Sequence, residues 1–181
     1  MIFKSYEIKK IDLEKIKILL FYGKNEGHKK EVTKNLVKGR GKIDNYYQNE
    51  ILDNRNEFLD NTYTSSLFEN QKTFIIKKVS DKILPIVEEL NLKKIGDTVL
   101  ILNAENLEKR SKLRSFFEKK NNYCCIAFYT DNDQTSMRLA TDFMREKGIS
   151  LSNENLNLII SKNNGDRENL YNDLKKIESL L

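Results

Sequence analysis

The stretch LLFYGKNEGHKKEV, residues 19–32, places two glycines and three lysines between an apolar run and a polar segment. A strand, a glycine loop and a helix in this order can hold phosphates, and the P-loop form of such a site requires G-x-x-x-x-G-K-[ST]. Here only three residues separate Gly23 from Gly27, and His28 and Lys29 follow where Lys and Ser or Thr are needed. The loop is one residue short and lacks the hydroxyl that would ligate Mg²⁺. We therefore predict that Gly23, Gly27 and Lys29 form a degenerate P-loop that does not bind nucleotide.

Other residues with catalytic chemistry are equally isolated. A site that hydrolyses nucleotide also needs carboxylates at a strand end, and the run VLILNAEN supplies Glu105 alone. His28 is the single histidine, so no Ser/His/Asp or Cys/His set can be assembled around any other residue. No carboxylate or cysteine partner is recognisable near His28, and a solvated helix residue is expected there. Cys124 and Cys125 are adjacent, which is not a metal-ligand spacing, and strand residues facing opposite ways are expected. The sequence predicts no catalytic residue, no metal site and no cofactor. An active P-loop ATPase stays open as an alternative.

The elements around the glycine loop alternate in a regular way. Short β-branched or aromatic runs at 17–23, 42–47, 72–80, 97–105 and 123–130 are separated by amphipathic stretches at 26–37, 53–63 and 107–120 and by a helix expected to begin after a cap at Ser80 or Asp81. Such alternation is typical of a parallel sheet flanked by helices. The continuous apolar run VLIL indicates a central strand that is buried on both faces. We expect an α/β domain over residues 1–130.

The pattern after Thr130 is helical only, with helices expected at 133–147, 152–162 and 167–181. These residues, 131–181, are expected to form a small all-helical domain. The last predicted helix runs to the final residue without a C-cap glycine. The chain is therefore expected to be a fragment that ends at a domain border.

Positive charge suggests a second kind of partner. The net charge is +5, and 33% of the residues are charged, so a nucleic acid is a permissible partner although lysines occur along the whole chain. The stretch EKRSKLRSFFEKK concentrates basic residues on one predicted helix, and Lys109, Arg110, Lys112 and Arg114 are the candidate DNA-facing residues. An ordinary amphipathic helix with a solvated basic face is the alternative. No apolar run is long enough to span a membrane and no signal peptide is recognisable, so a soluble cytoplasmic protein is expected.

The stretch TSSLFENQKTFII, residues 64–76, sets Leu67 and Phe68 side by side. Two consecutive apolar residues on a helix cannot both face the same core line, so one of them stays exposed or fills a pocket on a partner. Packing in the core, where both would seal the following strand, is the alternative reading from the residues alone.

Four pieces of the chain together resemble the delta subunit of the bacterial DNA polymerase III clamp loader. They are LLFYGKNEG, SLFENQKTFII, VLILNAENLEKRSKLRSFFEKK and GDRENLYNDLKKIESL, and they occur in the order and spacing of that family. The resemblance implies an AAA+-like P-loop NTPase-type sheet, a helical lid domain, and a collar domain that is absent after Leu181. It also implies a component of the DNA polymerase holoenzyme that opens the sliding clamp during DNA replication without hydrolysing ATP itself.

The resemblance also assigns site residues and partners. Leu67 and Phe68 would enter a pocket on the sliding clamp, the beta subunit, and Ser65 and Ser66 would precede them in the clamp-binding element. Some members of the family have an apolar residue where Ser65 stands, so this anchor would rest on two side chains. Other clamp-loader subunits would bind through the absent collar domain, and primed DNA would be a further partner. A basic nucleic-acid-binding module is the alternative function.

Overall fold

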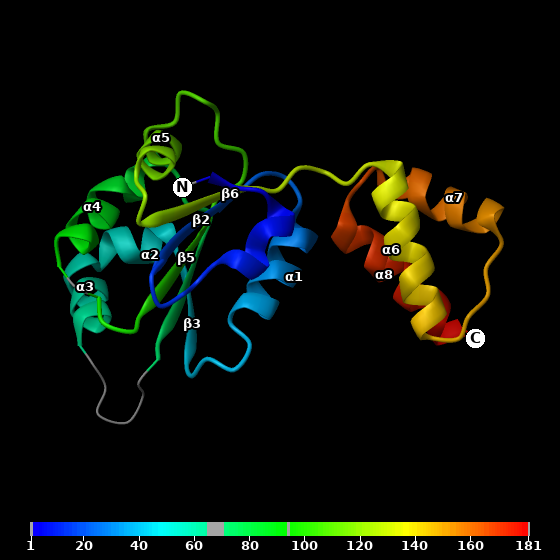
Figure 1. Cartoon of the computed structure of the whole chain (residues 1–181), viewed down its shortest axis with the longest axis horizontal. Coiled ribbons are helices and arrows are strands. Elements are labelled where there is room, and N and C mark those ends of the chain that lie inside the picture. Colours follow the sequence, from blue (N-terminus) through cyan, green and yellow to red (C-terminus); the bar gives the residue numbers. More distant parts are fainter. Residues whose placement is uncertain (1, 65–70, 94, 181) are drawn as a thin grey trace. The chain divides into compact units, whose positions relative to one another are not determined.

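A computed structural model describes residues 2–64, 71–93 and 95–180 of the chain (Figure 1). Within these residues six parallel strands form one sheet in the order β1-β6-β2-β5-β4-β3. The strands are β1 (Ile2–Phe3), β2 (Ile18–Tyr22), β3 (Ile43–Tyr47), β4 (Thr73–Lys77), β5 (Val99–Asn103) and β6 (Tyr123–Ala127). The predicted α/β class with a parallel sheet is confirmed. The sequence did not indicate β1, because two residues are too short to show a pattern.

The middle of the sheet is its most buried part. In β5 the side chains of Leu100, Ile101 and Leu102 are all 0% exposed. Leu20 of β2 is paired with Leu102 on one side and with Cys125 of β6 on the other. Burial on both faces favours continuous apolar strands, as the run VLIL indicated. By contrast, β3 lies at the edge and alternates between exposed and half-buried residues.

Helices lie on both faces of the sheet. Figure 1 shows α2 (Gln48–Asp53), α3 (Arg55–Tyr63) and α4 (Leu84–Leu92) on one side, and α1 (Glu26–Leu36) on the other. One apolar core joins the strands to α3, α4 and α5 (Lys112–Lys119), and it includes Leu20, Phe58, Phe74, Val87, Leu113 and Phe117. Short 3-10 turns, η1 (Ser5–Lys10) and η2 (Asp81–Ile83), complete this part of the chain.

Two predicted helices differ in extent from the observed ones. The helix predicted at 53–63 is α3, which begins only at Arg55 because Asn54 leaves helical geometry at φ −122° and ψ 47°; α2, which precedes it, was not predicted. The helix predicted at 107–120 begins only at Lys112, since the Ser111 hydroxyl caps it by accepting the backbone N–H of Arg114 at 3.2 Å. Lys109 and Arg110 therefore lie in the loop before the helix, a position that basic periodicity alone did not reveal.

The remaining helices have a core of their own. They are α6 (Asp133–Glu146), α7 (Asn153–Asn163) and α8 (Arg167–Leu180), and they pack around Ala140, Met144, Leu156, Ile160, Leu170 and Leu174. Asn132 and Ser152 cap α6 and α7 through their side-chain oxygens, and α7 ends at Asn164, whose φ is 47°.

The chain divides into two compact units. The sheet unit runs to Gly23 and resumes over Val32–Ala127, whereas the helical unit contains Lys24–Glu31 and the residues from Phe128 onward. The first turns of α1 thus cluster with α6 to α8, which the sequence did not indicate. The domain border expected at residue 130 stays a prediction. Along the described ranges, no helix has the length and apolar character needed to cross a membrane.

Candidate functional site

The loop between β2 and α1 holds the residues of the predicted degenerate P-loop. Gly23 has a φ of 121°, which is accessible to glycine and rarely to other residues, and its N–H donates to the carbonyl of Glu105 at 2.6 Å. The N–H of Asn25 donates to the carbonyl of Phe128 at 3.2 Å, and the N–H of His28 to the side chain of Asn25 at 3.0 Å. Each of these backbone donors already has a partner within the protein.

Gly27 serves packing inside the helical unit. A Cβ atom built on Gly27 would lie 2.5 Å from the backbone nitrogen of Glu168 and 3.0 Å from the carbonyl carbon of Arg167. Real Cβ contacts are not that short, so only glycine lets the first turn of α8 approach α1 so closely. In P-loops a glycine lets the backbone approach a phosphate, whereas here the neighbour at this glycine is protein backbone.

Lys29 is buried rather than presented to solvent. Its residue is 1% exposed, and its ammonium lies 2.5 Å from the carboxylate of Glu26, one turn earlier in α1. The P-loop lysine normally reaches the β- and γ-phosphates. In this chain a carboxylate of the same helix accepts that hydrogen bond.

Arg167 provides the most extensive polar network of the helical unit. Its guanidinium binds both carboxylate oxygens of Asp131 at 2.7 Å, and a further N–H donates to Glu31 at 2.9 Å. The side chains of Arg167 and Asp131 are each 7% exposed, which makes this a buried, bidentate ion pair. Burial lowers the pKa of Arg167, but the hydrogen bonds and charges of Asp131 and Glu31 outweigh it and leave the pKa raised. Lys30 forms an ion pair with Glu168 next to it.

His28 differs from its expected setting. The residue is half-buried, with its ring edge-on to Phe128 at a centroid distance of 5.0 Å. Burial, followed by the charge of Arg167, lowers the pKa of His28, so the ring is neutral at pH 7. The expectation of a solvated helix residue is therefore wrong, because α1 turns this side chain toward the helical unit.

The strand ends beside the loop carry no pair of carboxylates. After β5 comes Ala104 and then an exposed Glu105, while β4 ends at Lys77 and is followed by Lys78, both exposed. Across the described ranges there is also no cluster of His, Cys, Asp or Glu that could hold a metal ion.

The predicted DNA-facing residues divide into two groups. Lys109, Arg110 and Lys112 are exposed, whereas the side chain of Arg114 is only 17% exposed. Arg114 binds Glu118 at 2.8 Å, donates to the carbonyl of Leu107 at 3.2 Å, and stacks on the ring of Tyr22 at 4.9 Å. The start of α5 is held by Asp81, whose carboxylate accepts the Ser111 hydroxyl and the N–H groups of Lys112 and Leu113.

The predicted clamp-binding residues, Ser65, Ser66, Leu67 and Phe68, lie outside the described residues. The structure does describe both flanks of this segment. On one side α3 ends at Tyr63, and on the other Lys72 precedes β4 and donates to the carbonyls of Asn61 and Thr64 at 3.3 and 2.9 Å. Lys72 therefore joins the two ends of the segment that contains the predicted element.

Sequence reasoning missed two of these features. It did not single out Asp131 or Arg167 as partners, and it gave Lys72 no role. The composition of the turn NNGD before Arg167 indicates only a helix break. In the structure Gly165 has a φ of 75°, and a Cβ atom built on it would lie 2.2 Å from the carbonyl oxygen of Asp131.

Comparison with known proteins gives a likeness of fold. No protein-family model and no curated relative matches the chain. The DNA clamp loader delta protein of Bacillus subtilis superposes with a TM-score of 0.61 at 15% identity, over 97% of this chain and 56% of that one. AMPPCP-bound DnaA from Aquifex aeolicus gives a TM-score of 0.58 at 17% identity, over 96% of this chain and 60% of that one. Domain III of DnaA from Thermotoga maritima gives 0.51 at 13% identity, over 92% and 76%.

The chain spans 56% of the clamp loader protein and 60% of the Aquifex DnaA. At these identities the likeness concerns the fold, which the AAA+ domains of initiators and of a clamp-loader subunit have in common. Six parallel strands with helices on both faces, followed by three helices with their own core, agree with it. The chain therefore has the AAA+-like fold shared by these DNA replication proteins.

Proposed function

We propose that this chain is a delta-type clamp-loader subunit that binds and opens a sliding clamp through Leu67 and Phe68 and does not hydrolyse ATP. Similar structures include a clamp loader delta protein and also a nucleotide-bound initiator, so the fold does not decide between them. The phosphate loop favours the former, because Lys29 is buried against Glu26 and Gly27 lies against the backbone of α8. This occupation of the loop by the protein's own groups is the observation that carries the proposal.

The flanks of the clamp-binding element support the second half of the proposal. Lys72 binds two carbonyls near the end of α3, so the segment with Leu67 and Phe68 leaves and rejoins the sheet unit at fixed points. Each side chain, once fully buried in a partner, contributes about 1.5 to 3 kcal/mol.

The proposed mechanism uses binding energy to change the conformation of the clamp and involves no chemical step in this subunit. Binding at Leu67 and Phe68 opens a clamp only if the open conformation is bound more tightly than the closed one. Other loader subunits would assemble with this protein through a collar domain beyond Leu181, and their ATP hydrolysis would control access to the element. Such a subunit would work in the bacterial cytoplasm as part of the DNA polymerase holoenzyme.

A clamp-binding titration tests the proposal directly. The change of Leu67 and Phe68 to Ala should abolish detectable binding to the cognate clamp, since losing one aromatic anchor alone costs about 2 kcal/mol or more, or about thirtyfold in affinity. The melting temperature should move by only a few degrees, about the shift that 1 kcal/mol produces in a domain of this size.

A matched control keeps that result interpretable. Leu158 and Tyr129 are 68% and 72% exposed, so changing both to Ala removes one exposed leucine and one exposed aromatic elsewhere. This control should bind the clamp normally. Normal binding by the Leu67 and Phe68 variant, together with a much lower melting temperature, would place the pair in the core and refute the proposal. Clamp affinity should also be independent of MgATP, and an ATP dissociation constant tighter than about 100 μM, roughly −5.5 kcal/mol, would restore the ATPase alternative.

A second candidate function is sequence-independent binding of DNA, and a specific observation favours it. Lys109, Arg110 and Lys112 are exposed at the start of α5, and Asp81 fixes the backbone there through three hydrogen bonds. Exposed Lys and Arg side chains are the usual partners of phosphate groups. This role is compatible with the first, because a clamp loader handles primed DNA.

A further inference from the structure

The carboxyl edge of the sheet, where the strands end, brings together segments that lie far apart in the sequence. The backbone N–H and the hydroxyl of Ser80 both donate to the side-chain oxygen of Gln48, at 2.7 and 3.1 Å. Gln48 directly follows β3, and Ser80 lies shortly after β4. The next residue, Asp81, accepts three hydrogen bonds from the start of α5. The end of β3, the end of β4 and the start of α5 therefore meet at this edge of the sheet unit.

The side chains exposed at this edge are mainly cationic. All three lysines of the segment 77–82 are exposed, and none of them forms an ion pair with the described residues. They are Lys77, Lys78 and Lys82. The exposed cations at the start of α5 add to them. Of the acidic residues here, Asp81 uses both carboxylate oxygens to hold α5, while Glu105 and Glu108 are exposed. The lysines of 77–82 are therefore available to an anionic ligand.

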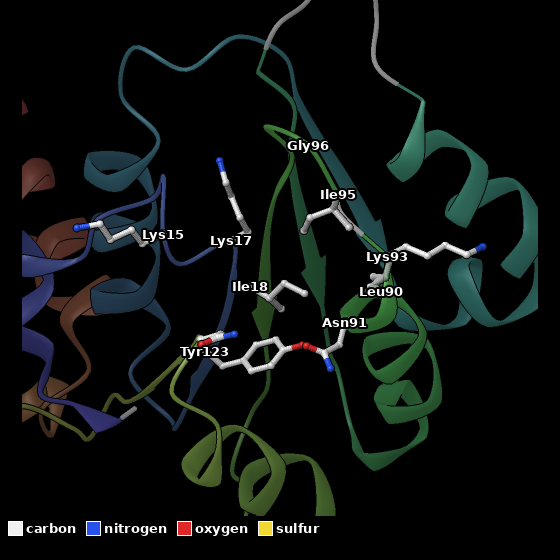
Figure 2. Close-up of a pocket in the computed structure, with 10 residues that line it drawn as sticks. Lys15, Lys17, Ile18, Leu90, Asn91, Lys93, Ile95, Gly96 and Tyr123 are labelled. Carbon is white, nitrogen blue, oxygen red and sulfur yellow. The ribbon is translucent and has the colours of Figure 1, made fainter.

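The lysines at the opposite, amino edge of the sheet differ in this respect. Figure 2 shows Lys15 and Lys17 there, beside the pocket that includes Ile18, the first residue of β2. The ammonium of Lys15 lies 3.6 Å from the carboxylate of Asp12, and that of Lys17 lies 3.3 Å from the carboxylate of Asp97. Unpaired charge therefore favours the carboxyl edge over the amino edge as the place where an anionic chain binds.

An exposed aromatic ring lies beside these cations. Tyr47, the last residue of β3, is 49% exposed, and Lys77 is its partner in the register of β3 with β4. Because side chains alternate between the faces of a sheet, residues at paired positions of neighbouring strands lie on the same face. Tyr46 lies on the other face, where its ring packs edge-on against Phe58 and Phe74. The ring of Tyr47 is therefore left accessible next to a cation.

We propose that the carboxyl edge of the sheet binds single-stranded DNA, with one base stacked on Tyr47 and the phosphates held by the lysines of 77–82 and the cations at the start of α5. This inference rests on the second candidate function and adds to it a base contact and a second group of phosphate contacts. An exposed aromatic ring among cations suits a single strand, because its unpaired bases present faces that can stack on the ring. No sequence preference is expected, since every base has such a face.

Two oligonucleotides separate the base contact from the phosphate contacts. One is oligothymidylate of about 12 nucleotides, the other is an abasic strand with the same number of phosphates, and fluorescence anisotropy measures the binding of each. Tyr47→Ala should weaken binding of oligothymidylate about fivefold or more, and binding of the abasic strand less than about twofold. Tyr47→Phe keeps the ring and should bind both strands as the wild type does. Tyr129→Ala, which removes a 72% exposed tyrosine elsewhere, should also bind normally.

The salt dependence of oligothymidylate binding tests the lysines. The double change Lys77→Gln, Lys78→Gln should reduce the slope of log K against log [salt] by about 1.4, whereas Lys15→Gln, Lys17→Gln should leave the slope unchanged. If changes at the start of α5 reduce the slope but the change at Lys77 and Lys78 does not, DNA binding stands and this inference fails. A wild-type chain that does not bind oligothymidylate would refute both.

A crosslink gives a result that does not depend on the stability of any variant. Oligothymidylate carrying 5-iododeoxyuridine, irradiated in the presence of the wild-type chain, should crosslink to Tyr47, and peptide mass spectrometry identifies the modified residue. Crosslinks confined to other residues would overturn the proposal. So would wild-type affinity of Tyr47→Ala for oligothymidylate, or an equal loss of its affinity for the two strands.

Discussion

Two basic regions of this molecule differ in whether their cations are paired with carboxylates of the protein. Around the phosphate loop, Lys29, Lys30 and Arg167 each bind a carboxylate of the helical unit. At the start of α5, Lys109 and Lys112 are exposed and form no ion pair with the described residues, and Arg110 pairs only with Glu108, with side chains 87% and 61% exposed. Such a surface pair is worth about 0 to 1 kcal/mol.

This difference shows why a count of basic residues is a poor guide to binding. The loop has the glycines and lysines that suggest an anion site, yet Lys29, Lys30 and Arg167 are each paired with a carboxylate within the fold. The region before α5 lacks a motif, yet its cations are available. The internal partner of each charge, rather than the number of charges, indicates where an anionic ligand can bind.

Of the changes that test this comparison, removal of Arg167 should lower the free energy of unfolding most. Arg167→Ala would leave Asp131 buried and unpaired, which typically costs about 3 to 5 kcal/mol, so the free energy of unfolding should fall by that amount. Urea denaturation measures it. Lys176→Ala is the control, since its ion pair with Asp173 is exposed on the lysine side at 72% and its loss should cost less than about 1 kcal/mol. Equal losses for the two variants would mean that the Arg167 network is no more than a surface pair.

Gly27→Ala should lower the free energy of unfolding by an intermediate amount, although this kind of change usually raises it. Alanine in place of glycine inside a helix usually stabilises by roughly 0.5 to 1 kcal/mol. Here the new Cβ would lie 2.5 Å from the backbone of Glu168, so we expect a loss of about 1 to 3 kcal/mol. Lys34→Ala, at an exposed position of the same helix, should be nearly neutral. A Gly27→Ala variant as stable as the wild type in the same denaturation assay would show that α8 does not occupy the space at this glycine.

The smallest expected effect concerns DNA. Binding to single-stranded oligothymidylate should weaken with salt, and removing one cation that binds a phosphate should reduce the slope of log K against log [salt] by about 0.7. The double change Lys109→Gln, Lys112→Gln should therefore reduce that slope by about 1.4. Lys30→Gln, Lys176→Gln removes two lysines that already bind carboxylates and should leave the slope unchanged. If the two double variants reduced the salt slope equally, pairing with a carboxylate of the protein would not determine which lysines contact DNA.

The fold was largely predictable from the sequence because its signals are local. The runs in β2 and β6 are apolar throughout and β5 is apolar as far as Leu102, as central parallel strands require. Errors arose where one residue interrupts a pattern. Asn54 delays the start of α3 and separates it from α2, which the sequence did not indicate, and the cap at Ser111 shortens another predicted helix.

The environment of the phosphate loop was less predictable, because it depends on contacts between distant residues. The motif failure at Gly23 to Lys29 could be read directly, whereas the pairing of Arg167 with Glu31 spans 136 positions. No local pattern in a single sequence encodes such a pair. The same holds for Lys72, whose bonds to Asn61 and Thr64 depend on how α3 returns to β4.

The two cysteines of β6 provide a built-in reporter of opening. Cys124 and Cys125 are 0% and 1% exposed, and only Cys125 belongs to the core with α3 to α5, as expected for neighbours on opposite faces of a strand. Burial raises the pKa of each thiol to about 12, so neither is a thiolate at neutral pH. Alkylation of these thiols therefore requires the packing over β6 to open, and the rate of modification by iodoacetamide measures how often that happens.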